Sequence, residues 1–182
     1  KSIFGHDFKH ENHLELLKQY VQNGRLLRYI ENAKSMEDVY NIFLTVPTFG
    51  SFLAYQYTID LNYSTLTNFS EMDFVKAGPG AKDGIKKCFV DRGDFTDDDI
   101  IKYMCDIQEK QFEILDLDFK SLWGRRLQLI DCQNLFCEVD KYSRVAHPDI
   151  SGISNRTRIK QVYKPENNKI EYFFPPKWEI NF

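Results

Sequence analysis

The stretch that decides the fold of this chain is Val46-Pro47-Thr48-Phe49-Gly50-Ser51-Phe52-Leu53-Ala54. It is a Pro-x-x-Gly turn between two apolar segments, which predicts two helices joined by a tight corner. The second helix should begin at Phe49 or Gly50 and present unsatisfied backbone N–H groups and partial positive charge. Such an end suits a phosphate group, so Thr48, Phe49 and Gly50 are candidate phosphate contacts. A plain helix-turn-helix corner is the alternative.

Capping signals extend the helical pattern over most of the chain. Ser35 with Asp38 predicts a helix from residue 36, and Thr96 with Asp99 predicts another from residue 97. Apolar spacing predicts further helices over residues 13–30, about 81–89 and about 119–142. The fold is therefore expected to be mostly α-helical.

The carboxy-terminal tail changes character. Residues 157–163 and 169–174 are typical of two short strands, joined by a turn over residues 165–168. A chain of 182 residues is expected to form one compact domain. We expect a single helical domain over residues 1–182. It comprises an amino-terminal helix region (1–35), a core with the hairpin and pocket (36–145) and a tail with a small β-hairpin (146–182).

Composition limits the classes of partner. Hydrophobic residues make up 42% of the chain and aromatic residues 15%, and no apolar run approaches the roughly 18 residues of a membrane span. We therefore expect no membrane partner and an intracellular location, cytoplasmic or nuclear (nucleoid). The net charge of −3 argues against a protein that coats DNA. Nucleic acid would be bound locally, through another module, or not at all.

Cysteine and histidine give no sign of a metal site. Cys88, Cys105, Cys132 and Cys137 form no Cys-x-x-Cys pair, so we expect reduced thiols, most of them buried. The four histidines form no convincing set of ligands. We expect neither a metal nor a cofactor.

The segment 73–81, Asp-Phe-Val-Lys-Ala-Gly-Pro-Gly-Ala, is a candidate anion site. Gly78 and Gly80 allow the backbone to approach a ligand closely, and the helix that follows favours an anion at its amino end. The segment lacks the Gly-Lys-Ser/Thr ending of a P-loop, so nucleotide hydrolysis is not indicated. The alternative is a loop that only turns the chain.

The segment 130–142 places polar side chains on one face of a predicted helix. Asn134, Glu138 and Lys141 follow helical spacing, and Gln133 lies beside the first of them. Amide and carboxylate groups can read the edge of a base. The alternative is a solvated face with an ordinary Glu–Lys pair. Downstream, Arg156, Arg158 and Lys160 could clamp phosphates or form a solvated strand face.

Together these segments resemble the helical domain of 5-hydroxymethyluracil DNA kinases, which is related to the α-glutamyl/putrescinyl thymine pyrophosphorylases. The resemblance covers about residues 41–178. Its most specific elements are Ala-Gly-Pro-Gly-Ala at 77–81 and Gln-Asn-x-Phe-Cys-Glu at 133–138. The other matching stretches are 47–56, 59–63, 73–76, 130–132, 139–142, 158–161 and 175–178.

The resemblance implies a divergent helix-hairpin-helix DNA glycosylase fold. In that fold a catalytic Asp follows the hairpin, and Asp73 follows Gly50 by 23 residues, close to the family's spacing. Asp73 is therefore the expected catalytic carboxylate. No Lys stands just after the hairpin, so an imine-forming lyase mechanism is not supported. The base pocket is expected from Gln133, Asn134, Glu138 and Lys141, and the phosphate contacts from Thr48, Phe49, Gly50, Gly78, Gly80, Arg156, Arg158 and Lys160.

We accordingly expect a monofunctional DNA glycosylase-like hydrolase. It would flip a thymine-derived, possibly hypermodified base out of DNA and cleave its N-glycosidic bond, with substitution at an activated 5-methylene group as the second choice. DNA carrying thymine or a modified thymine is the expected partner, and the oligomeric state stays open. Two alternatives remain: a non-catalytic modified-base recognition module of a larger DNA-modification protein, and an enzyme acting on free nucleotides. The chain has no ATP-binding kinase motif, so kinase activity would belong to another domain.

Overall fold

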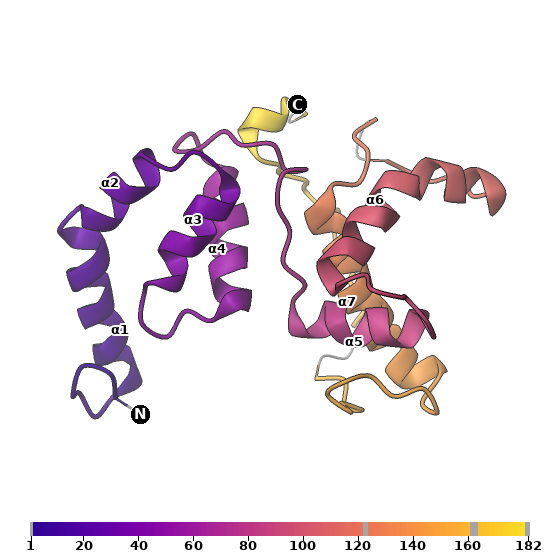
Figure 1. The fold of residues 1–182 in the computed structure, drawn as a ribbon, viewed down its shortest axis with the longest axis horizontal. Coiled ribbons are helices and arrows are strands. Elements are labelled where there is room, and N and C mark those ends of the chain that lie inside the picture. The colour runs from indigo at the N-terminus through magenta and orange to yellow at the C-terminus, as the bar shows by residue number, and fades with distance from the viewer. Residues whose placement is uncertain (1, 122–123, 161–163, 181–182) are drawn as a thin grey trace. The chain divides into compact units, whose positions relative to one another are not determined.

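A computed structural model describes residues 2–121, 124–160 and 164–180 (Figure 1). The chain divides into two compact units, one ending at Asp73 and one beginning at Phe74. The described residues form seven α-helices and no β-strand, so the prediction of a mostly helical fold is confirmed. No helix in this part of the chain is long and apolar enough to cross a membrane. One domain over residues 1–182 stays a prediction.

The first unit is built around a pair of helices, α3 and α4, that lie side by side (Figure 1). Their buried faces supply most of the apolar core of this unit, and Tyr55 and Met36 are fully enclosed. The unit consists of α1 (Lys9–Leu17), the π-helical turn η1 (Lys18–Gln22), α2 (Arg25–Glu31), α3 (Met36–Leu44) and α4 (Ser51–Asn62).

The predicted corner between two helices is present. The hydroxyl of Ser35 accepts a hydrogen bond from the Asp38 N–H at 3.0 Å, which opens α3 as its sequence signal predicts. The Tyr40 hydroxyl donates to the Ser51 Oγ at 2.9 Å and ties α3 to the start of α4. Gly50 is the N-cap of α4 and no side chain caps this helix. The turn therefore leaves the amino end of α4 without a side-chain acceptor.

The single helix expected over residues 13–30 is interrupted. Gly24 has a φ of 68°, a left-handed conformation that ends one helix and begins the next. The Asn23 Oδ1 accepts from the Arg25 N–H at 2.9 Å and supports the start of α2. In the helices on either side of this break, Leu16 and Ile30 are buried, whereas Leu14 is exposed.

The second unit is held by the close packing of α5 against α7. A Cβ atom at Gly84 would lie 2.0 Å from the Phe136 carbonyl oxygen, so only glycine fits at this crossing. The α6 helix begins with the predicted capping box of Thr96 and Asp99. The helices of this unit are α5 (Pro79–Cys88), α6 (Asp97–Ile114), α7 (Leu129–Ala146) and the 3₁₀ turn η2 (Pro176–Trp178).

The last long helix begins at Leu129 and not near residue 119 as predicted. The buried Gln108 side chain accepts from the Leu127 N–H at 2.9 Å and donates to the Leu127 carbonyl at 3.0 Å. These backbone groups are therefore engaged with α6 and cannot enter a helical hydrogen-bond ladder. Gln128 and Asp131 then form a capping box that opens α7.

The predicted β-hairpin of the tail is not supported. Residues 169–174 form no strand, and residues 161–163 of the other predicted strand lie outside the described residues. A two-stranded hairpin is marginally stable unless a further strand or a helix covers one face. Here Ile170 and Phe173 are exposed, and the Phe174 ring stacks on Trp178 at 6.1 Å between centroids.

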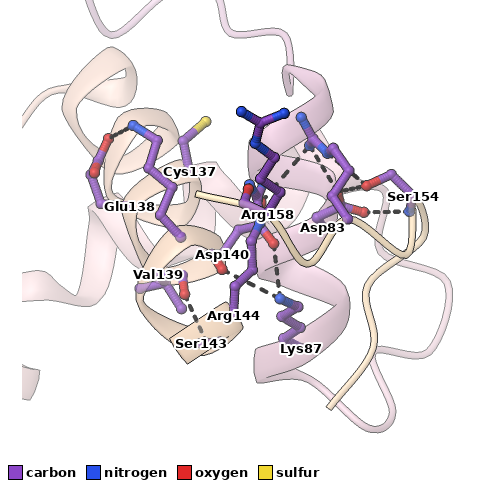
Figure 2. A network of polar contacts seen from close by, with 12 residues as sticks. Asp83, Lys87, Cys137, Glu138, Val139, Asp140, Ser143, Arg144, Ser154 and Arg158 are labelled. Carbon is purple, nitrogen blue, oxygen red and sulfur yellow. Dashed lines mark hydrogen bonds and ion pairs between the residues drawn. The ribbon is translucent and has the colours of Figure 1, made fainter. Parts of the chain in front are cut away.

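Two buried carboxylates link the elements of the second unit (Figure 2). Asp140 on α7 is 1% exposed and lies 2.9 Å from the Lys87 Nζ of α5. Arg144, one turn further along α7, makes a second ion pair with Asp140. Figure 2 shows Lys87 and Arg144 converging on this carboxylate. The Arg156 guanidinium lies 3.8 Å from Asp140 as well, so burial of the charge is compensated by three cations.

Asp83 on α5 is 2% exposed and anchors the loop that follows α7. It accepts from the Ser154 N–H at 2.8 Å, from the Ser154 hydroxyl and from Arg156 at 2.8 Å. A Cβ atom at Gly152 would lie 2.8 Å from its Oδ1, so the loop passes closely over it. Burial alone would raise the pKa of Asp83, but these donors outweigh it and lower the pKa to about 2.

Thr48 offers a test of strain in the hairpin. It has a φ of 72°, a conformation that is unfavourable for a β-branched residue and better tolerated by Asn. We expect Thr48→Asn to raise the free energy of unfolding by about 1 kcal/mol in urea denaturation. The control is Thr65→Asn, at an exposed threonine whose φ is not positive. An equal effect of both substitutions would contradict strain at Thr48.

Asp83 offers a test of the buried carboxylate. Its pKa lies below the ordinary value of 3.8 for an aspartate, so its stabilising effect is complete above pH 3.8 and is lost as pH falls through about 2. We expect Asp83→Asn to lower the free energy of unfolding by about 2 kcal/mol at pH 7.

The difference between this variant and the native protein should shrink as the pH is lowered from 4 to 2, measured by urea denaturation at each pH. Asp118→Asn, at a side chain that is 85% exposed, is the control and should show little effect. A difference that stays constant down to pH 2 would refute the lowered pKa.

Candidate functional site

The hairpin presents the amino end of α4 beside aromatic side chains. Thr48 and Gly50 are exposed, and the Phe49 ring packs on Tyr57 at 4.9 Å between centroids. Phe52, in the first turn of α4, is 44% exposed. The uncapped helix end can hold an anion, because its first N–H groups have no partner within the helix. Phosphate binding by Thr48, Phe49 and Gly50 stays a prediction.

Asp73 is exposed and lies in a bend at the end of the first unit, where its N–H donates to the Ser70 carbonyl at 3.2 Å. Gln133, Asn134 and Glu138 belong to the second unit. The convergence of Asp73 with these three side chains on one cleft therefore stays a prediction.

Gln133 joins the glycine segment to α7. Its side chain is buried, its Oε1 accepts from the Gly78 N–H at 3.0 Å and its Nε2 donates to the Asn134 Oδ1 at 2.8 Å. A Cβ atom at Gly80 would lie 3.1 Å from the Cys137 Sγ, so this glycine lets α5 approach α7. Ligand contacts at Gly78 and at Gln133 stay predictions, and an acceptor on the ligand would have to displace the Gln133 Oε1 to reach the Gly78 N–H.

The glycine segment has a second anchor that sequence reasoning missed. Asp98 accepts from the Ala77 N–H at 2.7 Å and from the Lys76 Nζ at 2.8 Å. Both donors precede α5, so Asp98 attaches the segment to the first turn of α6. In the sequence, Asp98 stands within a run of three acidic residues at 97–99, which by itself indicates only the start of a helix.

Asn134, Glu138 and Lys141 form an exposed polar stripe on α7. Glu138 and Lys141 are paired with each other. The Asn134 Oδ1 is engaged by Gln133, and its NH₂ group has no partner among the described residues. The stripe thus offers the amide donor of Asn134, which the buried Gln133 holds, and the carboxylate acceptor of Glu138. This chemistry can read the edge of a pyrimidine.

The basic residues of the tail differ in their surroundings. Arg156 is 45% exposed and is bonded to Asp83, whereas Arg158 and Lys160 are exposed. The Arg158 carbonyl accepts from the Arg144 guanidinium at 3.0 Å, which holds the tail near α7. The charges of Arg158 and Lys160 are therefore more available to a ligand than the charge of Arg156, which Asp83 partly neutralises. The spacing of Asp140 and Arg144 on one helix could have signalled this cluster.

The cysteines are free thiols. Cys105 and Cys132 are buried, and burial raises the pKa of Cys132 to about 12. A thiol with such a pKa is protonated at neutral pH and is a poor nucleophile. Cys132 thus has a role in packing.

Comparison with known proteins gives the family of the chain. The family model described as the helical domain of 5-hmdU DNA kinase matches residues 2–152. The 5-hmdU DNA kinase of Bacillus phage SP10 is 30% identical over 143 residues, which represent 74% of this chain and 22% of that protein. The chain thus spans less than a quarter of the length of this relative. No solved structure matches this chain.

These matches correct the expected reaction. A kinase transfers a phosphoryl group, whereas a glycosylase hydrolyses an N-glycosidic bond, so the assignment as a glycosylase-like hydrolase is wrong. The catalytic role predicted for Asp73 was tied to the glycosylase reaction and therefore has no basis in this family. The match also begins at residue 2, well before the region in which the sequence resemblance was placed. The chain belongs to the family of 5-hmdU DNA kinase helical domains.

Proposed function

We propose that this domain is the modified-base recognition module of a 5-hmdU DNA kinase and that another part of the protein transfers the phosphoryl group. The observation that carries the proposal is the match of residues 2–152 to the helical domain of that family. The sequence supports it, because it contains no Gly-Lys-Ser/Thr phosphate loop. The α3–α4 pair serves this module as a helix-hairpin-helix element that grips the DNA backbone.

The proposed ligand is a 5-hydroxymethyluracil base in DNA. Its hydroxyl lies inside the groove of the duplex, and an enzyme that modifies a base extrudes it from the stack. The Asn134 NH₂ group is suited to a carbonyl of the ring, and the Glu138 carboxylate is suited to the ring N–H or to the hydroxyl. Lys141 orients Glu138 through their ion pair.

Selectivity over thymine follows from the hydroxyl group. Thymine carries a methyl group where 5-hydroxymethyluracil carries a hydroxymethyl group. A site that hydrogen-bonds a substrate hydroxyl rejects the analogue that lacks it, because its own polar group is then left unpaired. Glu138 is exposed in the free domain, so this acceptor distinguishes the two bases once the bound base shields it from water.

The DNA backbone is held by few contacts in this proposal. The net charge of −3 leaves no broad basic surface, so phosphates meet the amino end of α4, the Gly78–Gly80 segment and the exposed tail cations Arg158 and Lys160. Such contacts position the DNA without reading its sequence. Selectivity then depends on the base pocket.

A binding assay tests the recognition of the base. Fluorescence anisotropy would compare two oligonucleotides that differ only by one 5-hydroxymethyluracil in place of thymine. We expect tighter binding of the modified strand, and Asn134→Ala should weaken binding of that strand by about tenfold, as expected for a lost base contact. Arg158→Ala should weaken binding of both strands alike. Equal affinity of the native domain for both strands would overturn the proposal.

The dependence of this affinity on salt tests the small footprint. Each neutralised phosphate contributes roughly −0.9 to the slope of log affinity against log salt on duplex DNA. Two or three contacts therefore predict a slope of about −2 to −3, and Arg158→Ala should make it shallower by about 1. A slope of about −7 or steeper would require eight or more phosphate contacts and would reveal a basic surface that the sequence does not predict.

A further inference from the structure

A small cavity in the second unit lies apart from the polar stripe of α7. It is enclosed by the end of α5, the end of α7 and the loop of residues 148–157, and its volume is about 30 Å³. One water needs roughly 10–15 Å³ of such space, so the cavity admits a group the size of two waters. A nucleobase is too large for it, whereas two oxygens of one phosphate group match its size, with the rest of the group at the opening.

The ionisable side chains that line this cavity are all cationic. They are Lys87, Arg144 and Arg156, and no acidic residue lines it within the described part of the chain. Asp83 and Asp140 do not line the cavity, but they form ion pairs with these cations and neutralise two of the three charges. The cluster therefore keeps a net positive charge of one. An anion in the cavity would meet an unbalanced charge in surroundings partly shielded from water.

Arg144 carries an unsatisfied donor in this cluster. Its side chain is 10% exposed, and its two terminal nitrogens are bonded to the Arg158 carbonyl and to Asp140. Its Nε is buried and has no hydrogen-bond partner among the residues that the structure describes. Buried donors are almost always satisfied, so a group without a partner in the protein requires an explanation. This Nε has almost no accessible surface, so an anion in the cavity would instead be met by the remaining N–H groups of the two terminal nitrogens.

The loop that closes the cavity is held in place and adds neutral donors. Asp83 accepts from the Ser154 N–H at 2.8 Å and fixes the centre of the loop to α5. Ser151, Asn155 and Thr157 of this loop line the cavity, and their side chains carry two hydroxyls and one amide. A cradle of cations and neutral donors on an anchored loop is suited to phosphate oxygens.

We propose that this cavity binds one phosphate group, with Lys87, Arg144 and Arg156 as its cationic partners. The site goes beyond the recognition of the base and does not depend on it. A diester in the DNA backbone and a phosphate monoester present the same anionic oxygens, so either can supply the group. The cations are donors in both cases, and no bond is made or broken.

Inorganic phosphate is the direct probe, added to the 182-residue chain at constant ionic strength and followed by ¹H–¹⁵N NMR. We expect saturable shifts of the amide signals of residues 151–157. Asn155→Asp adds a negative charge to the cavity at almost unchanged shape, and its φ of 51° is tolerated by Asp as by Asn. It should weaken phosphate binding by at least about tenfold. Asn168→Asp makes the same change outside this loop and should leave binding unchanged.

A second pair of variants guards against a local effect of Asn155. Ser151 is exposed at the edge of the cavity, so Ser151→Glu and Ser151→Gln should both fold. The Glu variant should lose phosphate binding and the Gln variant should keep it. Absence of saturable shifts in the native protein, or equal binding by Asn155→Asp and Asn168→Asp, would overturn the proposal.

Two further ligands identify the source of the phosphate. An oligonucleotide without a terminal phosphate should shift the same amides if the site takes a backbone diester. If the site takes a monoester, thymidine monophosphate should shift these amide signals and the oligonucleotide should not. Preference for 5-hydroxymethyluracil is measured separately. If the native protein shows that preference but binds no phosphate in the cavity, this inference is refuted and the proposed function is not.

Discussion

The second unit depends on the close approach of α5 and α7 at Gly84. No side chain fits between this residue and the Phe136 carbonyl, so the two backbones are nearly in contact. This approach lets Lys87 of α5 reach Asp140 of α7 and brings the Gly78 N–H to the Gln133 side chain. A larger residue would separate the helices and remove both connections. The polar sites of the unit are thus consequences of one packing constraint.

The same pair of helices supports two different kinds of chemistry. The stripe of Asn134, Glu138 and Lys141 is exposed and offers hydrogen-bonding groups that suit a base edge. Further along α7, Arg144 belongs to a buried cationic cluster that suits a phosphate. In this acidic protein, carboxylates hold the clustered cations of the proposed phosphate site in place.

The family match corrects the glycosylase reaction that was inferred from resemblance to the helix-hairpin-helix fold. A helical hairpin followed by an Asp is compatible with the glycosylase arrangement, but a fold supports many reactions and the chemistry lies in the site. The structure shows Asp73 exposed in a bend, and the family match indicates kinase proteins. The pattern of helices and the resemblance to 5-hydroxymethyluracil DNA kinases were thus sound, whereas the reaction assigned to them was not.

The sequence by itself determined the helical class, the starts of α3, α4 and α6 and the family, because capping boxes and the Pro-x-x-Gly turn act over a few residues. It also named Asn134 and Glu138 as candidates for the base pocket, and that role stays a prediction. Only the tertiary structure decided the start of α7, since Gln108 binds the backbone of Leu127 from 19 residues away. The pairing of Asp83 with Ser154, across 71 residues, was likewise invisible. Local patterns cannot show which distant partner will satisfy a buried charge, because burial itself is created by packing.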